Sequence, residues 1–296
     1  MHSLKQRTIF EALKWASSLL TAVGRDQNAA EILLMHVLEK SRSELLVSFH
    51  DDMPSERDRY FFELVKQHEK GIPVQHLTGS EMFYGRSFEV NEHVLIPRPE
   101  TEEVVLAALE MLEKVFPNDQ ELSAVDVGTG SGAIAITLAL EKKGMSVTAS
   151  DISKEALEVA KRNNQTLSAN VQFLQGDLLD PIVSHKLKVD LFISNPPYIA
   201  QEEMEGLSTV VTKYEPTHAL TDGRDGLWFY KRMTKDLYRV LKDEAIVVFE
   251  IGHTQAQDVQ TLLLQAFPST DVQIVKDING KDRAVCAHIQ TKSPAK

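Results

Sequence analysis

The sequence has little cysteine and no long hydrophobic run. Among its 296 residues only Cys286 is a cysteine, which excludes an internal disulfide framework. No apolar stretch approaches the roughly 18 residues that a membrane-spanning helix needs. The first residues, Met1 to Arg7, lack the hydrophobic core of a signal peptide. We therefore expect a cytoplasmic protein without a membrane span.

The sequence is also short of positive charge and of clustered metal ligands. Lys and Arg number 32 against 43 Asp and Glu, and the net charge of −11 at pH 7 argues against a generic nucleic-acid binder. The 10 histidines show no close pair and no Cys/His cluster at ligand spacing, so no metal site is predicted. No heptad seam is present, so a monomer is expected.

The composition and the first quarter of the chain indicate a globular protein that begins with helices. An apolar share of 43% with 25% charged residues is ordinary for globular domains. Apolar residues recur at helical spacing in three stretches: Ile9 to Leu20, Ala30 to Leu38 and Tyr60 to Val65. These predict a small helical domain over residues 1–72. Turn residues between short extended pieces then predict a hairpin linker over 73–97, and a second domain over 98–296.

From Leu122 onward, predicted strands alternate with predicted helices. The strands are Val125 to Val127, Ser146 to Ser150, Val171 to Leu174, Val189 to Ile193, Ala245 to Ile251, Val272 to Asp277 and Ala284 to Ile289. The helices are Ile134 to Glu141, Lys154 to Asn164 and Leu227 to Leu241. This alternation is typical of an α/β fold with a doubly wound, mostly parallel, seven-stranded sheet. The pair Asn279-Gly280 is a tight-turn signal, which predicts that the last strand is antiparallel.

A glycine-rich turn follows the first of these strands. Asp126-Val127-Gly128-Thr129-Gly130-Ser131-Gly132 runs from strand to helix, and its glycines let the backbone turn tightly and approach a ligand closely. Asp151, at the end of the next strand, suits the ribose hydroxyls of a nicotinamide or an adenosyl cofactor alike. The turn predicts a cofactor site but does not choose between these cofactors, and a tight turn without a ligand is the alternative.

Two carboxylates favour S-adenosylmethionine as the cofactor. Asp126, two residues before the first glycine, can hold a cationic amino-acid end directly or through water. Asp177, in the stretch Gly176-Asp177-Leu178 after the third strand, can reach an adenine amine. Together they make an adenosyl cofactor with a charged amino-acid end the better match.

The stretch Asn195-Pro196-Pro197-Tyr198 lies at the carboxyl end of a predicted strand, where open α/β sheets keep their binding sites. The Asn195 side-chain oxygen and the Pro196 carbonyl can each accept one N–H of a planar NH2 group. The prolines stiffen the loop and Tyr198 can stack on the flat group. Such positioning turns the nitrogen lone pair toward an electrophile. A rigid turn without a function is the alternative.

These motifs, in this order, resemble a class I methyltransferase that acts on planar NH2 groups. Within that class the chain is similar to the release factor glutamine methyltransferase family, PrmC/HemK. Further stretches that carry the resemblance are Gln75 to Gly79, Phe83 to Gly85, Leu95 to Glu102, Glu215-Pro216, Ala219-Leu220, Asp225 to Leu227 and Glu250 to Gly252. The resemblance spans nearly the whole chain, including the helical domain, and implies a Rossmann-like catalytic domain.

The resemblance implies N5-methylation of the glutamine in the Gly-Gly-Gln loop of peptide chain release factors, with S-adenosylhomocysteine as product. It places cofactor residues on Gly128 to Gly132, Asp151 and Leu178, and substrate residues on Asn195 to Tyr198. Asn195, Pro196 and Tyr198 are the predicted catalytic residues, and Asn195 also borders the cofactor. No general base is assigned, because the methylated nitrogen can lose its proton to Asn195, Pro196 or water. The resemblance also implies that the helical domain helps dock the protein substrate.

Three other functions remain open at this stage. A glutamine methyltransferase of a ribosomal protein would share the fold and the motifs. An adenine-N6 methyltransferase would face the same delocalised lone pair, but it would need to flip a base and to grip phosphates. A non-catalytic adaptor would keep the cofactor pocket alone.

For three single residues the sequence allows two interpretations each. Arg98 is either a solvated loop charge or part of a cofactor entrance. Glu250 either caps a strand end or contacts the substrate. Cys286 lies in an apolar strand and is predicted to be a core residue rather than a nucleophile.

Overall fold

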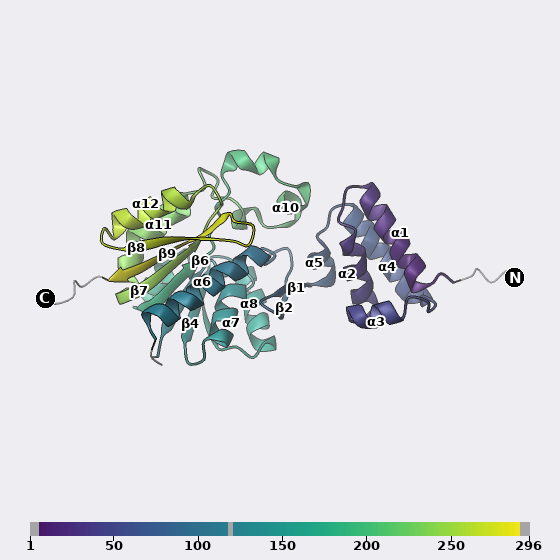
Figure 1. The fold of residues 1–296 in the computed structure, drawn as a ribbon, viewed down its shortest axis with the longest axis horizontal. Helices are drawn as coiled ribbons and strands as arrows, with labels where there is room; N and C mark the ends of the chain where they lie inside the picture. The colour runs from purple at the N-terminus through teal and green to yellow at the C-terminus, as the bar shows by residue number, and fades with distance from the viewer. Residues whose placement is uncertain (1–5, 118–120, 291–296) are drawn as a thin grey trace. The chain divides into compact units, whose positions relative to one another are not determined.

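The computed structural model describes residues 6–117 and 121–290 (Figure 1). The chain divides into two compact units. One contains Met1–Ser80 and Ser208–Tyr214, and the other contains Glu81–Leu207 and Glu215–Lys296. No helix within the described ranges is long and apolar enough to cross a membrane.

The first unit is helical, as the periodicity predicts. Its helices are α1 (Ile9–Ala22), α2 (Asn28–Leu38), α3 (Arg42–Val47), α4 (Ser55–Glu69), α5 (Val74–Thr78) and α10 (Thr209–Tyr214). Helix α1 begins with a capping box, in which Thr8 accepts from the Glu11 N–H and the Glu11 carboxylate accepts from the Thr8 N–H. Leu33 and Phe61 lie fully buried in its core.

The expected linker over 73–97 is wrong in its first part. Residues Val74–Thr78 form helix α5, because Pro73 suits the position before a first helical turn and Gly79, with φ of +73°, suits the position after the last. The hairpin follows, with β1 (Ser80–Phe83) and β2 (Arg86–Glu89) joined by Tyr84-Gly85. Both turn residues have positive φ, which matches the two-residue hairpin turn.

The second unit is built on a seven-stranded sheet with the order β5-β4-β3-β6-β7-β9-β8. Its strands are β3 (Ser123–Val127), β4 (Ser146–Asp151), β5 (Val171–Gln175), β6 (Val189–Ser194), β7 (Leu241–Glu250), β8 (Asp271–Lys276) and β9 (Asp282–Gln290). The pairs among β3 to β7 are parallel, whereas β9 is antiparallel to both of its neighbours. The predicted mostly parallel sheet and its antiparallel last strand are confirmed.

Helices cover both faces of this sheet (Figure 1). On one side lie α6 (Pro99–Val115), α7 (Ala133–Glu141) and α8 (Lys154–Thr166); on the other lie α11 (Trp228–Asp236) and α12 (Ala256–Ala266). Alternate residues of β3 belong to different cores, since Ala124 packs with α6 and α7 while Val125 packs with α11 and α12. Cys286 is buried in the core that contains α6 and α7, as predicted.

The remaining elements are short and connect the strands. They are α9 (Asp180–Ser184) and the 3-10 helices η1 (Gln201–Gly206), η2 (Thr217–Ala219) and η3 (Leu237–Arg239). The helix predicted to run from Leu227 to Leu241 is α11, which ends at Asp236 and continues as η3. The parallel register aligns Val127 with Ser194 and Ser194 with Phe249, so the carboxyl ends of β3, β6 and β7 meet at one edge. The predicted site residues lie at this edge.

Candidate active site

A cavity of about 620 Å³ opens at the carboxyl ends of the parallel strands in the second unit. The strand-end loops that line it contribute Gly128 to Ser131 after β3, Asp151 to Ser153 after β4, Gly176 to Leu178 after β5, and Asn195 and Pro197 after β6. Side chains before and within α6 and α11 complete the wall, among them Arg98, Thr101, Trp228 and Arg232. The size and position are those of a small-molecule site.

The glycine loop has the backbone conformation that only glycine adopts without strain. Gly128, Gly130 and Gly132 have φ of +77°, +55° and +83°. A Cβ on Gly132 would lie 2.8 Å from Ile136 Cδ1 and 3.2 Å from Ala160 Cβ, so this glycine also lets α7 and α8 approach closely. The loop therefore brings main-chain atoms to the surface of the cavity at Gly128 and Gly130.

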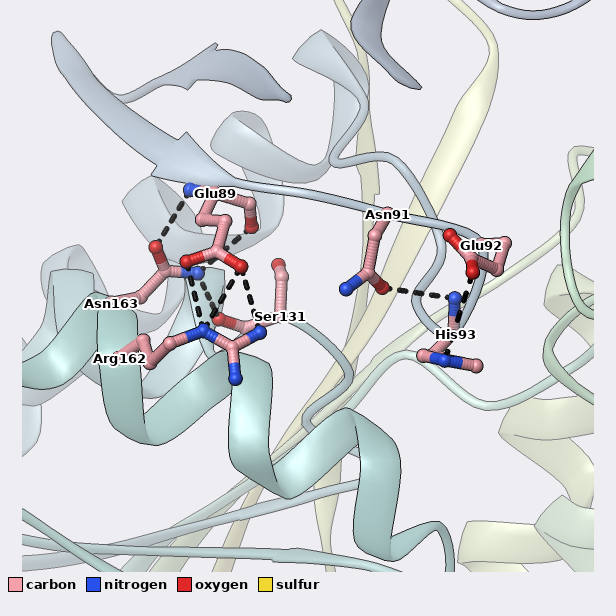
Figure 2. A network of polar contacts seen from close by, with 7 residues as sticks. All are labelled: Glu89, Asn91, Glu92, His93, Ser131, Arg162 and Asn163. Carbon is pink, nitrogen blue, oxygen red and sulfur yellow. Dashed lines mark hydrogen bonds and ion pairs between the residues drawn. The ribbon is translucent and has the colours of Figure 1, made fainter. Parts of the chain in front are cut away.

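A buried asparagine holds this loop to the hairpin (Figure 2). Asn163 of α8 donates from Nδ2 to the Ser131 carbonyl at 2.9 Å and to the Glu89 carbonyl at 3.0 Å, and its Oδ1 accepts from the Glu89 N–H at 2.6 Å. The Glu89 carboxylate in turn pairs with Arg162 at 2.7 Å. All three hydrogen-bonding groups of the Asn163 amide are used, so it fixes the position of Ser131.

Asp126 lies beneath the cavity surface, with an exposed fraction of 0%. Its Oδ2 accepts from the Thr129 hydroxyl at 2.6 Å, whereas its buried Oδ1 finds no hydrogen-bond partner in the described chain. Burial raises the pKa of Asp126 to about 7, against the hydrogen bond from Thr129 and the effect of the nearby Ala135 N–H. An unpartnered buried oxygen fits a ligand that brings a donor or a positive charge.

The other two predicted carboxylates line the cavity and already have partners. Asp151 accepts from the Ser153 N–H and the Gly130 N–H, each at 2.9 Å, and burial raises its pKa against these bonds. Asp177 pairs with Arg232 at 2.6 Å, and that guanidinium lies over the Trp228 ring. An adenine amine would therefore share the Asp177 carboxylate with Arg232. The next residue along the chain, Leu178, also lines the cavity.

The Asn-Pro-Pro-Tyr stretch follows β6 directly. The Ser194 hydroxyl donates to the Val127 carbonyl at 2.7 Å and so joins the ends of β6 and β3. Asn195 and Pro197 line the cavity, Pro196 is buried, and Tyr198 packs partly buried against the core that contains α11 and α12. Burial raises the pKa of the Tyr198 phenol to about 12, so the phenol keeps its proton.

The backbone after the prolines is held by a side-chain amide. Gln255 Nε2 donates to the Tyr198 carbonyl at 2.9 Å and to the Gly226 carbonyl at 3.1 Å, while its Oε1 accepts from the Gly252 N–H at 3.0 Å. A Cβ on Gly226 would lie 2.4 Å from the Tyr198 carbonyl oxygen. The glycines at 226 and 252 therefore belong to the packing around the Asn-Pro-Pro-Tyr stretch.

Arg98 lies on the cavity wall and is tied to a buried carboxylate. It pairs with Glu215 at 2.5 Å, and Glu215, whose side chain is 2% exposed, also accepts from the Ile96 N–H at 3.2 Å. Of the two interpretations of Arg98, the structure favours the entrance to the cavity over a solvated loop charge.

Sequence reasoning missed several residues that the structure brings to the site. Thr101 and Arg232 line the cavity from helices, and Asn163 holds the glycine loop. Asn163 had one signal, since a polar residue stands there in the apolar stripe of Ala156, Val159 and Ala160. Residues 6–117 and 121–290 place no three His, Cys, Asp or Glu side chains where they could share a metal ion.

Comparisons with known proteins agree with this geometry. A family model of the PrmC N-terminal domain matches residues 11–79, and one of the methyltransferase small domain matches residues 103–221. The release factor glutamine methyltransferase of Bacillus subtilis (strain 168) is 56% identical over 283 residues, which cover 96% of this chain and 98% of that protein. The enzyme of the same name from Bacillus anthracis is 53% identical over 282 residues, which cover 95% of this chain and 99% of that protein.

One solved structure shares the fold at low sequence identity. The hMettl16 catalytic domain in complex with MAT2A 3'UTR hairpin 6 is 16% identical, with a TM-score of 0.53, and the match covers 81% of this chain and 83% of that one. At this identity the match supports the fold of the chain alone.

Proposed function

This chain belongs to the release factor glutamine methyltransferase family, and on that premise we propose its reaction. It transfers a methyl group from S-adenosylmethionine to N5 of the glutamine in the Gly-Gly-Gln motif of peptide chain release factors, with S-adenosylhomocysteine as the other product. One observation carries the proposal: a single cavity is lined on one side by the glycine loop and Asp151 and on the other by Asn195 and Pro197. Cofactor and amide therefore have adjoining places.

Several features of the cavity fit S-adenosylmethionine. The left-handed backbone at Gly128 and Gly130 allows close approach of a ligand. Asp126 Oδ1, buried and without a partner in the described chain, suits the cationic amino-acid end, directly or through water. Asp151 suits the ribose hydroxyls, and Asp177 and Leu178, which also line the cavity, suit the adenine end. When bound, the cofactor supplies an electrophilic methyl group on a positively charged sulfur.

The Asn-Pro-Pro-Tyr stretch prepares the acceptor. An amide nitrogen is a poor nucleophile because its lone pair is delocalised. The Asn195 side-chain oxygen and the Pro196 carbonyl each accept one N–H of the glutamine, which holds the amide in one plane and turns its lone pair toward the methyl group. The two prolines limit movement of the loop, and Tyr198 stacks against the flat amide.

The chain contributes positioning and exclusion of water rather than a strong base. Methylation makes the nitrogen acidic, and its proton leaves to the Asn195 side-chain oxygen, the Pro196 carbonyl or water. The first unit carries the match to the PrmC N-terminal domain. We propose that residues 1–72 dock the release factor while residues 98–296 carry out the transfer, as a monomer in the cytoplasm without stable nucleic-acid binding.

Mass spectrometry tests the reaction. Purified, unmethylated release factor is incubated with the protein and S-adenosylmethionine, with a ribosomal protein and duplex DNA in parallel. A gain of one methyl group mapped to the Gly-Gly-Gln glutamine is the expected result. A methyl group on the ribosomal protein or on the DNA, with none on the release factor, would contradict the proposed substrate.

A further inference from the structure

Glu250 stands beside the amide-binding residue at the carboxyl edge of the sheet. Strands β6 and β7 are parallel neighbours with Ser194 opposite Phe249, so the next residues, Asn195 and Glu250, follow at the same level. Glu250 is 2% exposed, although an ionised carboxylate at such a depth is costly without partners. A buried carboxyl next to a site residue calls for a role.

Thr101 completes a small cluster with these two side chains. It lies in the first turn of α6, is 5% exposed, and its Oγ1 lies 3.5 Å from Asn195 Nδ2. Hydrogen bonding by the Thr101 and Asn195 side chains lowers the pKa of the Glu250 carboxyl, which burial raises, so both side chains lie within reach of it. The Glu250 oxygen Oε2 is buried and has no hydrogen-bond partner in the part of the chain that the structure describes. The carboxyl group is thus turned toward Asn195 and Thr101.

We propose that Glu250, together with Thr101, is a positioning residue that fixes which way the Asn195 side-chain amide points. A carboxylate only accepts hydrogen bonds, so Asn195 turns Nδ2 toward it and leaves Oδ1 for an N–H of the substrate amide. The opposite orientation would place Asn195 Oδ1 against the Glu250 carboxylate, so that two acceptors meet. It would also turn the Asn195 NH2 toward the substrate N–H, so that two donors meet. The inference deepens the proposed function and rests on the role of Asn195 in it.

The protonation state of Glu250 controls this arrangement. Burial raises its pKa to about 7, against hydrogen bonds from Thr101 and Asn195 and the charge of Arg283. Once protonated, Glu250 is itself a donor and can donate to Asn195 Oδ1, which removes the acceptor that the substrate needs. Turnover therefore falls as the pH drops through about 7. The titratable and charged groups that face Glu250 are Glu100 on α6, Tyr198 after β6, Tyr230 on α11 and Arg283 on β9.

The kinetic test compares variants that keep or remove the hydrogen-bond acceptor at position 250 and the hydroxyl at position 101. With Glu250→Ala, kcat should fall by about 10- to 100-fold, and with Thr101→Val by about 3- to 10-fold, while the Kd for S-adenosylhomocysteine stays within about twofold. Glu250→Gln keeps an acceptor oxygen, so at pH 8 it should retain kcat to within about fivefold and lose the pH dependence near 7. Glu244→Gln, on the exposed part of the same strand, is the matched control and should behave as the wild type.

The outcomes separate this role from others. If Glu250→Ala folds, binds cofactor and keeps kcat within about twofold, the positioning role is wrong. Equal losses for Glu250→Ala and Glu250→Gln would also overturn it, because the charge itself would then be required. If Glu250→Ala does not fold, Thr101→Val and Glu250→Gln give the decision.

A second measurement needs no substrate. In nitrogen-15 NMR spectra, the Asn195 side-chain NH2 resonances should titrate with a midpoint near pH 7 in the wild type and should not titrate in Glu250→Gln. Asn195 resonances that change with neither the pH nor the substitution would overturn the inference. If the wild type methylates no release factor, the proposed function fails by itself, while this titration still decides whether Glu250 orients Asn195.

Discussion

Each half of the cavity has a buried carboxyl group behind its lining residues, but the two halves hold their loops in different ways. The proposed cofactor half contains the glycine loop and Asp151, and the proposed amide half contains Asn195 and Pro197. Asp126 at β3 and Glu250 at β7 both have a pKa that burial raises to about 7, and each has one buried oxygen without a partner in the described chain. In the cofactor half, positive-φ glycines open the main chain to a ligand. In the amide half, prolines and the side chain of Gln255 hold a loop still.

This difference connects each half to a different kinetic quantity. A loop that opens its main chain to a ligand contributes to affinity, because it binds the cofactor before and during the reaction. A loop that holds two acceptors in one plane contributes to turnover, because alignment matters most as the new bond forms. Changes in the cofactor half should raise Kd, and changes in the amide half should lower kcat.

The largest effect is expected from Asn195→Ala. Loss of a positioned hydrogen-bond partner of the reacting group should lower kcat by roughly 100- to 1000-fold and leave the Kd for S-adenosylhomocysteine within about twofold. Methylation of the release factor followed by mass spectrometry, with calorimetry for the Kd, measures both. Asn170→Ala, an exposed asparagine just before β5, is the control. Turnover that survives Asn195→Ala would refute the mechanism and remove the contrast between the halves.

Gly226→Ala should displace the Asn-Pro-Pro-Tyr stretch without touching the substrate. The new methyl would lie 2.4 Å from the Tyr198 carbonyl oxygen, at a residue with φ of +76°. A shift of about 1 Å in a positioned group costs roughly 100-fold in turnover. Gly223→Ala is the matched control, since φ there is +69° and the new Cβ meets no described atom within 4 Å. Equal kcat values for the two variants would show that the strain of a positive φ, and not the clash with the Tyr198 carbonyl, determines the turnover.

Asp126→Asn should act on cofactor binding instead. The ionised carboxylate attracts the cationic amino-acid end, so the substitution should raise the Kd for S-adenosylhomocysteine at pH 8 by about tenfold, which is about 1.4 kcal/mol. The pKa of Asp126 is raised to about 7, so the carboxyl is neutral below that pH and ionised above it. Wild-type affinity should therefore weaken as the pH falls through about 7.

The comparison of Kd against pH for the wild type and Asp126→Asn isolates this group, because titration of the ligand affects both proteins alike. The groups that act on Asp126 are the Thr129 hydroxyl, the Ala135 N–H and the Asp151 carboxylate. A pH dependence that persists in the variant would assign the titration to another group. A change in kcat with no change in Kd would place Asp126 with the amide half.

The smallest effect is expected from Asn163→Ala. Its amide ties the glycine loop to the hairpin, so the loss should lower the free energy of unfolding by about 1 to 3 kcal/mol and raise the Kd by about threefold. Asn164→Ala, one residue further along α8, is the control, because the Asn164 side chain accepts only from the Val171 N–H in the described contacts. Urea unfolding and calorimetry measure the two quantities. Equal effects of both variants on the Kd would exclude a specific support of the loop by Asn163.

Much of the fold was predictable because local patterns carried it. Parallel strands buried on both faces need nearly continuous apolar runs, and Val189 to Ile193 is such a run apart from Asp190. The glycine run signalled a strand-to-helix turn, and Asn279-Gly280 signalled the hairpin at the end. The segment 73–79 was misjudged, since a proline and a glycine mark the boundaries of a short helix as readily as they mark a linker.

By itself the sequence determined the order of the strands and helices and the loops that carry the chemistry, because those depend on neighbours within a few residues. Only the tertiary structure decided which distant side chains meet: Glu250 and Thr101 beside Asn195, Asn163 under the glycine loop, and Gln255 behind Tyr198. These contacts join residues tens of positions apart. Burial, which raises the pKa values of Asp126 and Glu250, also depends on the packing of several elements at once.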